Sequence, residues 1–235
     1  MKGAAVRCVV GGLLVAAFAT SAGAAVGCTL NDPDRDIRRI FPGATNYRTD
    51  FIAIADRADD GLYARVERRL GDELDDVYEA PDVPYAYYTV LQDEEVIGRV
   101  HGVNQKGTYG GMQLILATDP DGVVVDFYYQ RIASPEADEF TDEAFTSQFV
   151  GLTLLDFQRE AENAPGVPRV ESSIDDPSDE SREDFEATLR GLRKNLILLD
   201  EFMLGNSYYR EIRNERRDEG SGNAHEKRDT GRTGG

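Results

Sequence analysis

Residues that could bind a ligand gather in one stretch, Val103 to Gln130, which reads VNQKGTYGGMQLILATDPDGVVVDFYYQ. Lys106 offers a cation for a phosphate, Tyr109 offers a flat ring for stacking, and Gln105 offers an amide for the edge of a heterocycle. Gly110 and Gly111 let the main chain approach a neighbouring group closely. A phosphorylated planar ligand such as a flavin nucleotide needs these groups. Composition alone favours the simpler interpretation, a wide hairpin connection whose glycines serve only its turns.

Other chemistry finds little support along the chain. The two histidines are His101, in a predicted strand, and His225, near the C-terminus. Without a histidine pair or a second mature cysteine, the residues do not favour a zinc or iron site. The acidic pairs, such as Asp175-Asp176, lack the spacing of a calcium loop and are typical of solvated charges. No nucleophile triad, phosphate loop or dinucleotide motif is present, so we name no catalytic and no metal-binding residue.

The elements around the glycine stretch are predicted to be strands. Ranges 83–92 and 95–103 flank an Asp93-Glu94 turn, and ranges 111–119 and 123–131 flank an Asp-Pro-Asp-Gly turn, which is a strong hairpin signal. In the last range one face is expected to carry Val123, Val125, Phe127 and Tyr129, and the other Asp126 and Gln130. This alternation predicts an antiparallel sheet that is covered on one side.

Helices are expected before and after these strands. Residues 37–81 are predicted to form an N-terminal layer, with a strand near Phe51 and a helix that ends near Gly71. A helix over 141–151 is expected to be capped by Thr141, and another is expected to follow over 152–160. The strongest helix runs over 183–204, with Ser181 and Asp184 approximating a capping box. Its apolar stripe consists of Phe185, Leu189, Leu192, Leu196, Leu199 and Met203. The fold class is therefore α+β, with residues 82–205 as the main domain and 206–235 as a disordered charged tail.

The N-terminus has the pattern of a secretory signal peptide over residues 1–27. A positive start is followed by the short apolar run VVGGLLVAAF and then by small residues. Ala25-Val26-Gly27-Cys28 resembles a bacterial lipobox, although the usual leucine is Ala25 here. We therefore expect lipidation of Cys28, a polar tether over 28–36, and a protein attached through the acyl chains to a membrane of the cell envelope. The alternative is ordinary cleavage near Ala25, with Cys28 an incidental thiol.

The charge of the chain excludes one class of partner. The formal net charge is -18, and removal of Lys2 and Arg7 with the signal peptide leaves 26 - 2 = 24 basic against 44 acidic residues, or -20. Such a surface repels nucleic acid and anionic lipid head groups, so nucleic-acid binding is not expected.

The order of these motifs resembles the FMN-binding domain family over about Tyr85 to Leu204. That family includes extracytoplasmic flavin subunits of ion-pumping electron-transfer complexes. Tyr109-Gly110-Gly111 matches its Gly-Tyr-x-Gly motif, and Asp121-Gly122 matches its turn. Ser134-Pro135-Glu136 stands in place of Glu-Thr-Pro-Gly but lacks the glycine, while Phe149 and Gly151 match a Phe/Gly pair. The final Ser-Gly-Ala-Thr motif is reduced to Ala187-Thr188 and falls inside the predicted helix.

The resemblance implies a twisted antiparallel sheet packed against helices, and FMN as the cofactor for electron transfer between membrane carriers. Thr188 takes the place of the family threonine that can carry FMN covalently, but its position inside a helix favours reversible binding over covalent attachment. A membrane electron-transfer or transporter complex would be the partner. The alternative is a flavin-free lipoprotein that serves a membrane complex as an accessory or adaptor. The candidate binding residues are Gln105, Lys106, Tyr109, Gly110, Gly111, Ser134 and Thr188.

Overall fold

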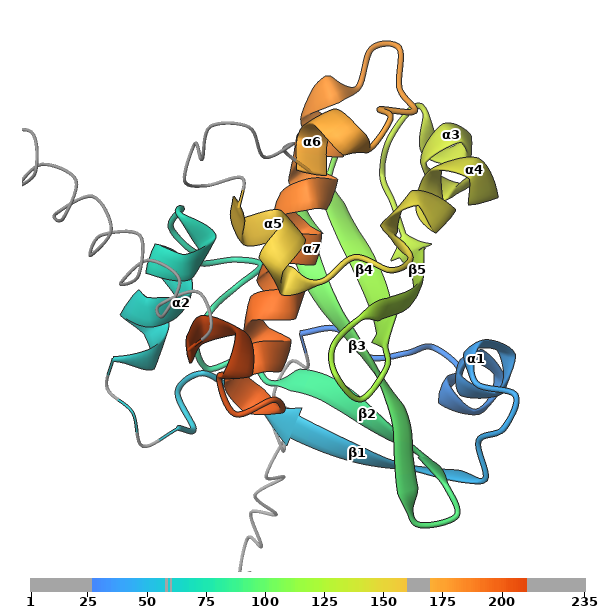
Figure 1. Cartoon of the computed structure of the whole chain (residues 1–235). Helices are drawn as coiled ribbons and strands as arrows, with labels where there is room; N and C mark the ends of the chain where they lie inside the picture. The colour runs from blue at the N-terminus through green and yellow to red at the C-terminus, as the bar shows by residue number, and fades with distance from the viewer. Residues whose placement is uncertain (1–26, 58, 60, 160–169, 211–235) are drawn as a thin grey trace, which may run out of the picture.

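The computed structural model describes residues 27–57, 59, 61–159 and 170–210. It has the expected α+β fold, in which helices pack against one five-stranded antiparallel sheet (Figure 1). The strands follow one another in the sheet in chain order, so each neighbouring pair is antiparallel. The strands are β1 (Asn46–Ile52), β2 (Tyr85–Gln92), β3 (Glu95–Lys106), β4 (Gly111–Thr118) and β5 (Val124–Arg131).

Tight turns join the last four strands. Asp93 adopts the left-handed conformation between β2 and β3, with φ 55°. Between β4 and β5, Gly122 has φ 92°, and the carboxylate of Asp119 accepts hydrogen bonds from the Asp121 and Val123 amides. The predicted hairpin is therefore confirmed, and its turn is held by the side chain of its first aspartate.

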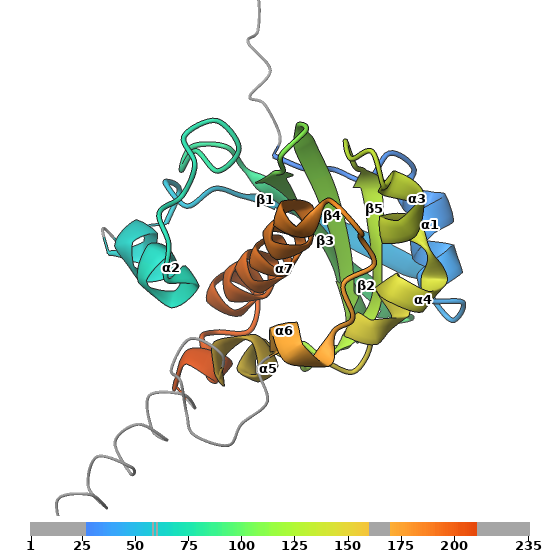
Figure 2. The same ribbon diagram turned by 90° about the horizontal axis from the view of Figure 1, so that it is seen from above.

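The long helix α7 (Arg182–Phe202) crosses one face of the sheet, and Figure 2 shows α2 (Leu62–Leu70) beside it. The apolar stripe of α7 is buried against strand residues such as Leu114, Leu116 and Phe127. Gly71, with φ 74°, ends α2 as expected. The remaining elements contribute buried side chains to the same core; they are α3 (Ala137–Thr141), α4 (Glu143–Thr146), the 3₁₀ helix η1 (Ser147–Phe149), α5 (Leu154–Arg159) and α6 (Val170–Ser173).

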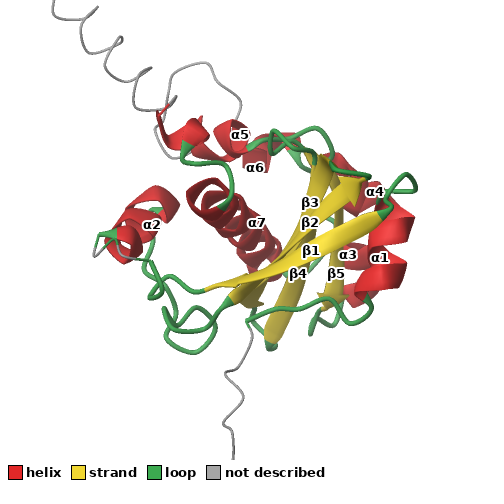
Figure 3. Cartoon of the chain, turned by 90° about the horizontal axis from the view of Figure 1, so that it is seen from below, coloured by secondary structure: helices red, strands yellow, loops and turns green. Residues whose placement is uncertain are grey.

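The second face of the sheet is also covered. This corrects two expectations, that the sheet is covered on one side only and that residues 28–36 form a polar tether. Helix α1 (Pro33–Ile40) begins inside the range predicted to be a polar tether, with Asp32 as its N-cap and Pro33 at its first position. Figure 3 shows α1 on the side of the sheet opposite α7. Cys28, Leu30 and Ile37 are buried there against a second apolar cluster. The predicted tether is wrong because Cys28 and Leu30, together with Ile37 of α1, cover this face of the sheet.

A bulge corrects the expected facing of β5. Thr118 pairs with Val124 and Ala117 pairs with Asp126, so Val125 is the extra residue of a register shift. Val124 therefore joins Phe127 and Tyr129 in the main core, whereas Val125 is exposed. Strict alternation predicted the reverse for these two valines.

The helix ends also differ from the sequence expectations. Asp142, not Thr141, caps α4, because its carboxylate accepts a hydrogen bond from the Ala144 amide at 2.7 Å. Ser181 is the N-cap residue of α7 but makes no side-chain capping bond. The predicted capping box is wrong, since Asp184 uses its carboxylate elsewhere. Gly205 has φ 63° and follows the helix as expected.

Residues 1–26 of the predicted signal peptide and residues 211–235 of the predicted tail lie outside the described residues, which begin at Gly27 and end at Arg210. Among the residues that are described, no helix has the length and apolar character needed to cross a bilayer.

Candidate functional site

The glycine hairpin between β3 and β4 closes on itself. Lys106 pairs with Gly111 at the end of the two strands, and the Gly107 amide donates to the Gly110 carbonyl at 2.8 Å. Gly110 has φ 146°, a conformation that favours glycine. The Gly107 amide is therefore used within the hairpin and is not available to a ligand, as the simpler interpretation of the glycines, a hairpin connection, predicts.

A carboxylate from α7 occupies the next amide of the hairpin. Asp184 Oδ1 accepts a hydrogen bond from the Thr108 amide at 2.8 Å, and the side chain is buried. A Cβ atom at Gly107 would lie 2.9 Å from the same oxygen, so glycine is needed for this approach. Asp184 Oδ2 is buried without a hydrogen-bond partner among the described residues. A negative charge thus stands where a phosphate would have to approach the hairpin.

A second carboxylate binds the amides just before α7. Glu136 accepts hydrogen bonds from the Asp179 amide at 2.9 Å and from the Glu180 amide at 3.3 Å. A side-chain hydrogen bond with Ser181, followed by the amide bonds, lowers the pKa of Glu136, so it is ionised at neutral pH. These two amides precede Ser181, the N-cap residue of α7, so a carboxylate of the chain itself occupies this group of main-chain donors.

The predicted binding residues do not converge on one ligand. Tyr109 is 55% exposed, and Lys106 is 66% exposed with its amine 3.6 Å from Asp75. Gln105 is buried and turns towards α7, where its carbonyl oxygen accepts from Arg190 and Lys194. Ser134 accepts a long hydrogen bond, 3.4 Å, from the Glu136 amide. Gly110 and Gly111 face Ala133 and Tyr78, the nearest side chains to Cβ atoms built at these two glycines.

Thr188 is placed inside the core. Its hydroxyl donates to the Asp184 carbonyl at 2.8 Å, so the Tyr129 hydroxyl, 2.7 Å away, is the donor in their contact. Thr188 is fully buried in the second turn of α7. An enzyme that attaches FMN needs an accessible hydroxyl, and Thr188 does not present one in this arrangement.

A buried polar cluster that includes Gln105 was missed by the sequence analysis. Lys194 and Glu79 are both buried and form a close ion pair. Lys194 also donates to the Asn104 carbonyl at 2.7 Å and to Gln105 Oε1 at 3.1 Å. Burial lowers the pKa of Lys194 to about 8, against the raising effect of Glu79. Burial also acts to raise the pKa of Glu79, but hydrogen bonds from Arg190 and the charge of Lys194 leave it below its ordinary value.

Arg190 completes this cluster and uses all five of its N–H groups. Nε donates to Asp72, Nη1 donates to Glu79 and Gln105, and Nη2 donates to Glu79 and to the Glu73 carbonyl. The three protons of Lys194 are likewise all engaged. No donor is left for a ligand, so the cluster is a clamp that holds residues 72–79 onto α7. Arg190 and Lys194 are like charges one helical turn apart, which is unfavourable unless a negative charge lies between them. This spacing was the signal in the sequence for a partner such as Glu79.

A hollow of about 480 Å³ lies outside the clamp, between residues 72–75, the end of β3 and one side of α7. Four acidic side chains line it, against two bases among the lining residues, Lys106 and Arg190. All N–H groups of Arg190 already donate hydrogen bonds, and Lys106 lies next to Asp75, so the hollow attracts an anion only weakly.

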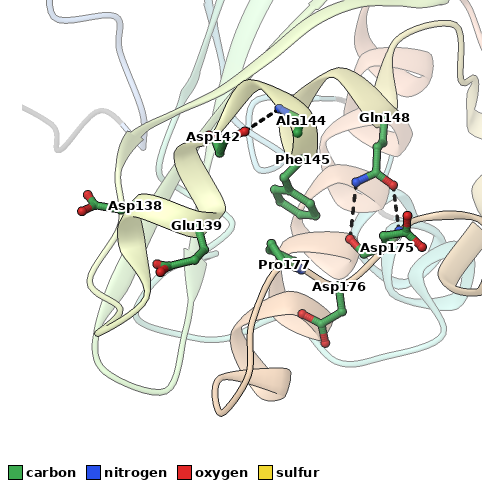
Figure 4. Close-up of a pocket in the computed structure, with 9 residues that line it drawn as sticks. All are labelled: Asp138, Glu139, Asp142, Ala144, Phe145, Gln148, Asp175, Asp176 and Pro177. Carbon is green, nitrogen blue, oxygen red and sulfur yellow. Dashed lines mark hydrogen bonds between the residues drawn. The ribbon is translucent and has the colours of Figure 1, made fainter.

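A second hollow, of about 510 Å³, lies between α3, α4 and the loop before α7 (Figure 4). Gln148 closes one end, since its amide exchanges two hydrogen bonds with the main chain of Asp175. Its lining combines five carboxylates with the Phe145 ring and Pro177. Within the described residues no group of three or more histidine, cysteine or acidic side chains has a metal-binding arrangement.

Cys28, the predicted lipid site, has its sulfur inside the second apolar cluster. A Cβ atom at Gly102 would lie 2.8 Å from Cys28 Sγ, and burial raises the pKa of the thiol to about 12. The Gly27 amide donates to the Pro84 carbonyl, and the Asn31 amide donates to Gln130. A lipid on this sulfur does not fit the packing, so acylation would require residues 27–30 to leave the sheet.

No model of a protein family matches this chain, and no curated protein matches it. The resemblance to the FMN-binding domain family therefore depends on the short motifs alone.

Proposed function

We propose that this chain is an exported accessory protein of the cell envelope that acts through its surface and holds no flavin. The observation that carries the proposal is the occupation of two groups of amides by the chain's own carboxylates. Asp184 binds the glycine hairpin, and Glu136 binds the main chain ahead of α7. A phosphate would have to displace both or bind beside them, against two negative charges.

Export is inferred from the signal-peptide pattern of residues 1–27. Attachment through acylated Cys28 and the folded position of Cys28 are alternative states, because the sulfur is buried in the sheet cover. A membrane-bound form would therefore have residues 27–30 released from the sheet.

Reversible FMN binding for electron transfer is the second candidate. The observation in its favour is that Tyr109 and Lys106, at the same hairpin, are both exposed and could stack on a ring and approach a phosphate. The partner would be a membrane electron-transfer complex, as the motif resemblance implies.

A flavin titration separates the two candidates. The full chain, purified in a mild detergent, is incubated with FMN and passed over a gel-filtration column while flavin absorbance is followed. We expect the flavin to elute apart from the protein. A stoichiometric flavin band that travels with the protein would overturn the flavin-free proposal, and its survival in denaturant, with loss in Thr188→Ala, would identify covalent attachment.

A pair of variants tests the physical reason. Replacing both occupying carboxylates, Asp184→Asn with Glu136→Gln, removes the two negative charges and is expected to improve FMN affinity over that of the parent chain. The matched control replaces Asp138 and Glu139, two carboxylates of the second hollow, in the same way. Equal effects of the two double variants would show that Asp184 and Glu136 have no special role.

A further inference from the structure

The outer edge of β1 is an open strand edge. β1 is the first strand in the sheet order and pairs only with β2 among the described residues (Figures 1 and 3). The Tyr47 amide donates to Asn46 Oδ1 of its own strand at 2.8 Å, as an amide that is turned away from β2 can do. Because main-chain groups alternate in direction along an antiparallel strand, those of Tyr47, Thr49 and Phe51 point away from the sheet. An open edge of this kind is a template for another strand.

The side chains of β1 are complementary to themselves when the strand is reversed. The sequence is NYRTDFI, with Thr49 at its centre. In an antiparallel pair of two copies centred on Thr49, Arg48 lies opposite Asp50 of the other copy, and Tyr47 lies opposite Phe51. Opposite charges and aromatic pairs in these positions are the cross-strand pairs that stabilise sheets.

Other registers are disfavoured by the same residues. The outward-pointing groups must face one another, so the symmetry axis has to pass through a residue. An axis through Arg48 or through Asp50 would place two like charges opposite each other. Only the axis through Thr49 places Arg48 of each copy opposite Asp50 of the other. The two charges therefore favour this register and disfavour the registers centred on Arg48 or Asp50.

We propose that two copies of this chain pair antiparallel along β1, with Thr49 on the twofold axis, to form one continuous ten-stranded sheet. Phe51, which is 54% exposed in the single chain, would be covered by Tyr47 of the other copy. Arg48 and Asp50 form an ion pair of 3.0 Å within one strand. In the dimer, Arg48 of each copy would also lie opposite Asp50 of the other copy. β1 carries no net charge, so it is a place where two strongly acidic molecules can meet.

The oligomeric state of the full chain tests this inference, by sedimentation velocity in detergent at about 0.5 M salt, which screens the overall repulsion. We expect a concentration-dependent dimer. Arg48→Asp and Asp50→Arg should each weaken it by about tenfold, because each variant creates two like-charged pairs. The exchange Arg48→Asp with Asp50→Arg should restore it. A monomer at all concentrations, or a dimer that ignores these changes, would overturn the inference.

Two more variants distinguish pairing along β1 from loss of folding and from association through detergent micelles. Thr49→Pro removes an outward-pointing N–H that β2 does not use, so it should abolish the dimer while the melting temperature stays within a few degrees. Thr49→Cys should form a disulfide between copies under mild oxidation, since directly paired Cα atoms lie about 5.5 Å apart. Val77→Cys, at a position that is 80% exposed, is the control. Equal cross-linking at both positions would contradict the pairing. The inference does not depend on whether the protein binds flavin.

Discussion

Asp184 shows how one side chain changes the meaning of a motif. The glycines at 107, 110 and 111 are spaced as they would be around a ligand, but the carboxylate of Asp184 takes the amide of Thr108. Its second oxygen is buried and unpartnered among the described residues. The residue thus links the first turn of α7 to the hairpin at the cost of one unsatisfied acceptor.

Asp184→Ala is expected to lower the free energy of unfolding by about 2 kcal/mol, because a buried hydrogen bond to a charged group is lost. Asp184→Asn should cost less, since its amide oxygen can still accept from Thr108. Urea denaturation measures both. Asp138→Ala, in the second hollow, is the control and should be nearly neutral. If Asp184→Asn is as damaging as Asp184→Ala, the hydrogen bond to Thr108 is not the cause.

The ion cluster of Glu79, Arg190 and Lys194 is closed, with every donor of both bases in use. Removing one partner of a buried pair leaves the other charge uncompensated. Lys194→Met is therefore expected to lower the free energy of unfolding by about 3 kcal/mol.

The double variant Lys194→Met with Glu79→Gln should recover part of this loss, because it leaves no unpaired charge of this pair. Thermal melting and urea denaturation check both variants. Arg38→Ala removes an exposed pair with Asp34, at 3.8 Å, and should change stability by less than about 0.5 kcal/mol. Additive effects of the two network changes would contradict a coupled clamp.

Among the elements, α7 has the most to do with positioning. It supplies Asp184 to the hairpin, Thr188 to the core and Arg190 and Lys194 to the clamp. It lies close to the sheet at Gly191, where a Cβ atom would collide with Leu114 Cδ1 and lie 3.2 Å from Gln105 Cβ. The absence of a side chain there sets the spacing between helix and sheet.

Gly191→Ala is accordingly expected to destabilise the protein by about 1–3 kcal/mol, although alanine is the better helix former by about 1 kcal/mol. The collision with Leu114 outweighs the propensity gain. Glu186→Ala, on an exposed position of the same helix, is the control and should be neutral or slightly stabilising once its pair with Arg182 is discounted. Unfolding midpoints decide the comparison, and a more stable Gly191→Ala would show that the helix can move away.

In the whole molecule, helices and the N-terminal segment cover both faces of one sheet, and the outer surface of the protein is strongly acidic. His101 lies between sheet and α7, stacked on Tyr87 with ring centroids 5.3 Å apart and hydrogen-bonded to Asn195. Burial lowers the pKa of His101 to about 4, against the raising effect of Asn195. Folded protein therefore holds a neutral histidine where an unfolded chain would take up a proton.

This gives a pH dependence with a definite sign. As pH falls from about 6.5 to 4, the unfolded chain gains a proton at His101 and the folded chain does not, so stability decreases by about 3 kcal/mol. His101→Gln cannot titrate and should lack this component. The difference between the two free-energy curves, from urea denaturation at several pH values, isolates it from the carboxylates. If the parent and His101→Gln curves of unfolding free energy against pH are parallel, His101 takes up its proton equally in the folded and unfolded chains, which would contradict the prediction.

Local patterns in the sequence determined much of the fold. The Asp-Pro-Asp-Gly turn, the strands beside it, the stripe of α7 and the end of α2 at Gly71 were all predictable, because each depends on periodicity or on one turn residue. The glycines at 107–111 were also correctly singled out, but their purpose could not be inferred from spacing. A hairpin that closes on itself and a loop that wraps a ligand need the same residue types.

Tertiary structure alone decided the site. Lys194 meets Glu79 across 115 residues, and Asp184 meets Thr108 across 76. Such contacts depend on how α7 is rotated and how far it lies from the sheet, which no local pattern encodes. The N-terminal cover was missed for the same reason: Cys28 and Leu30 are buried only because β2 and β3 present a second apolar face to them. Short-range periodicity fixes which face of an element is apolar, whereas the partner of each polar side chain depends on the packing of elements distant in the chain.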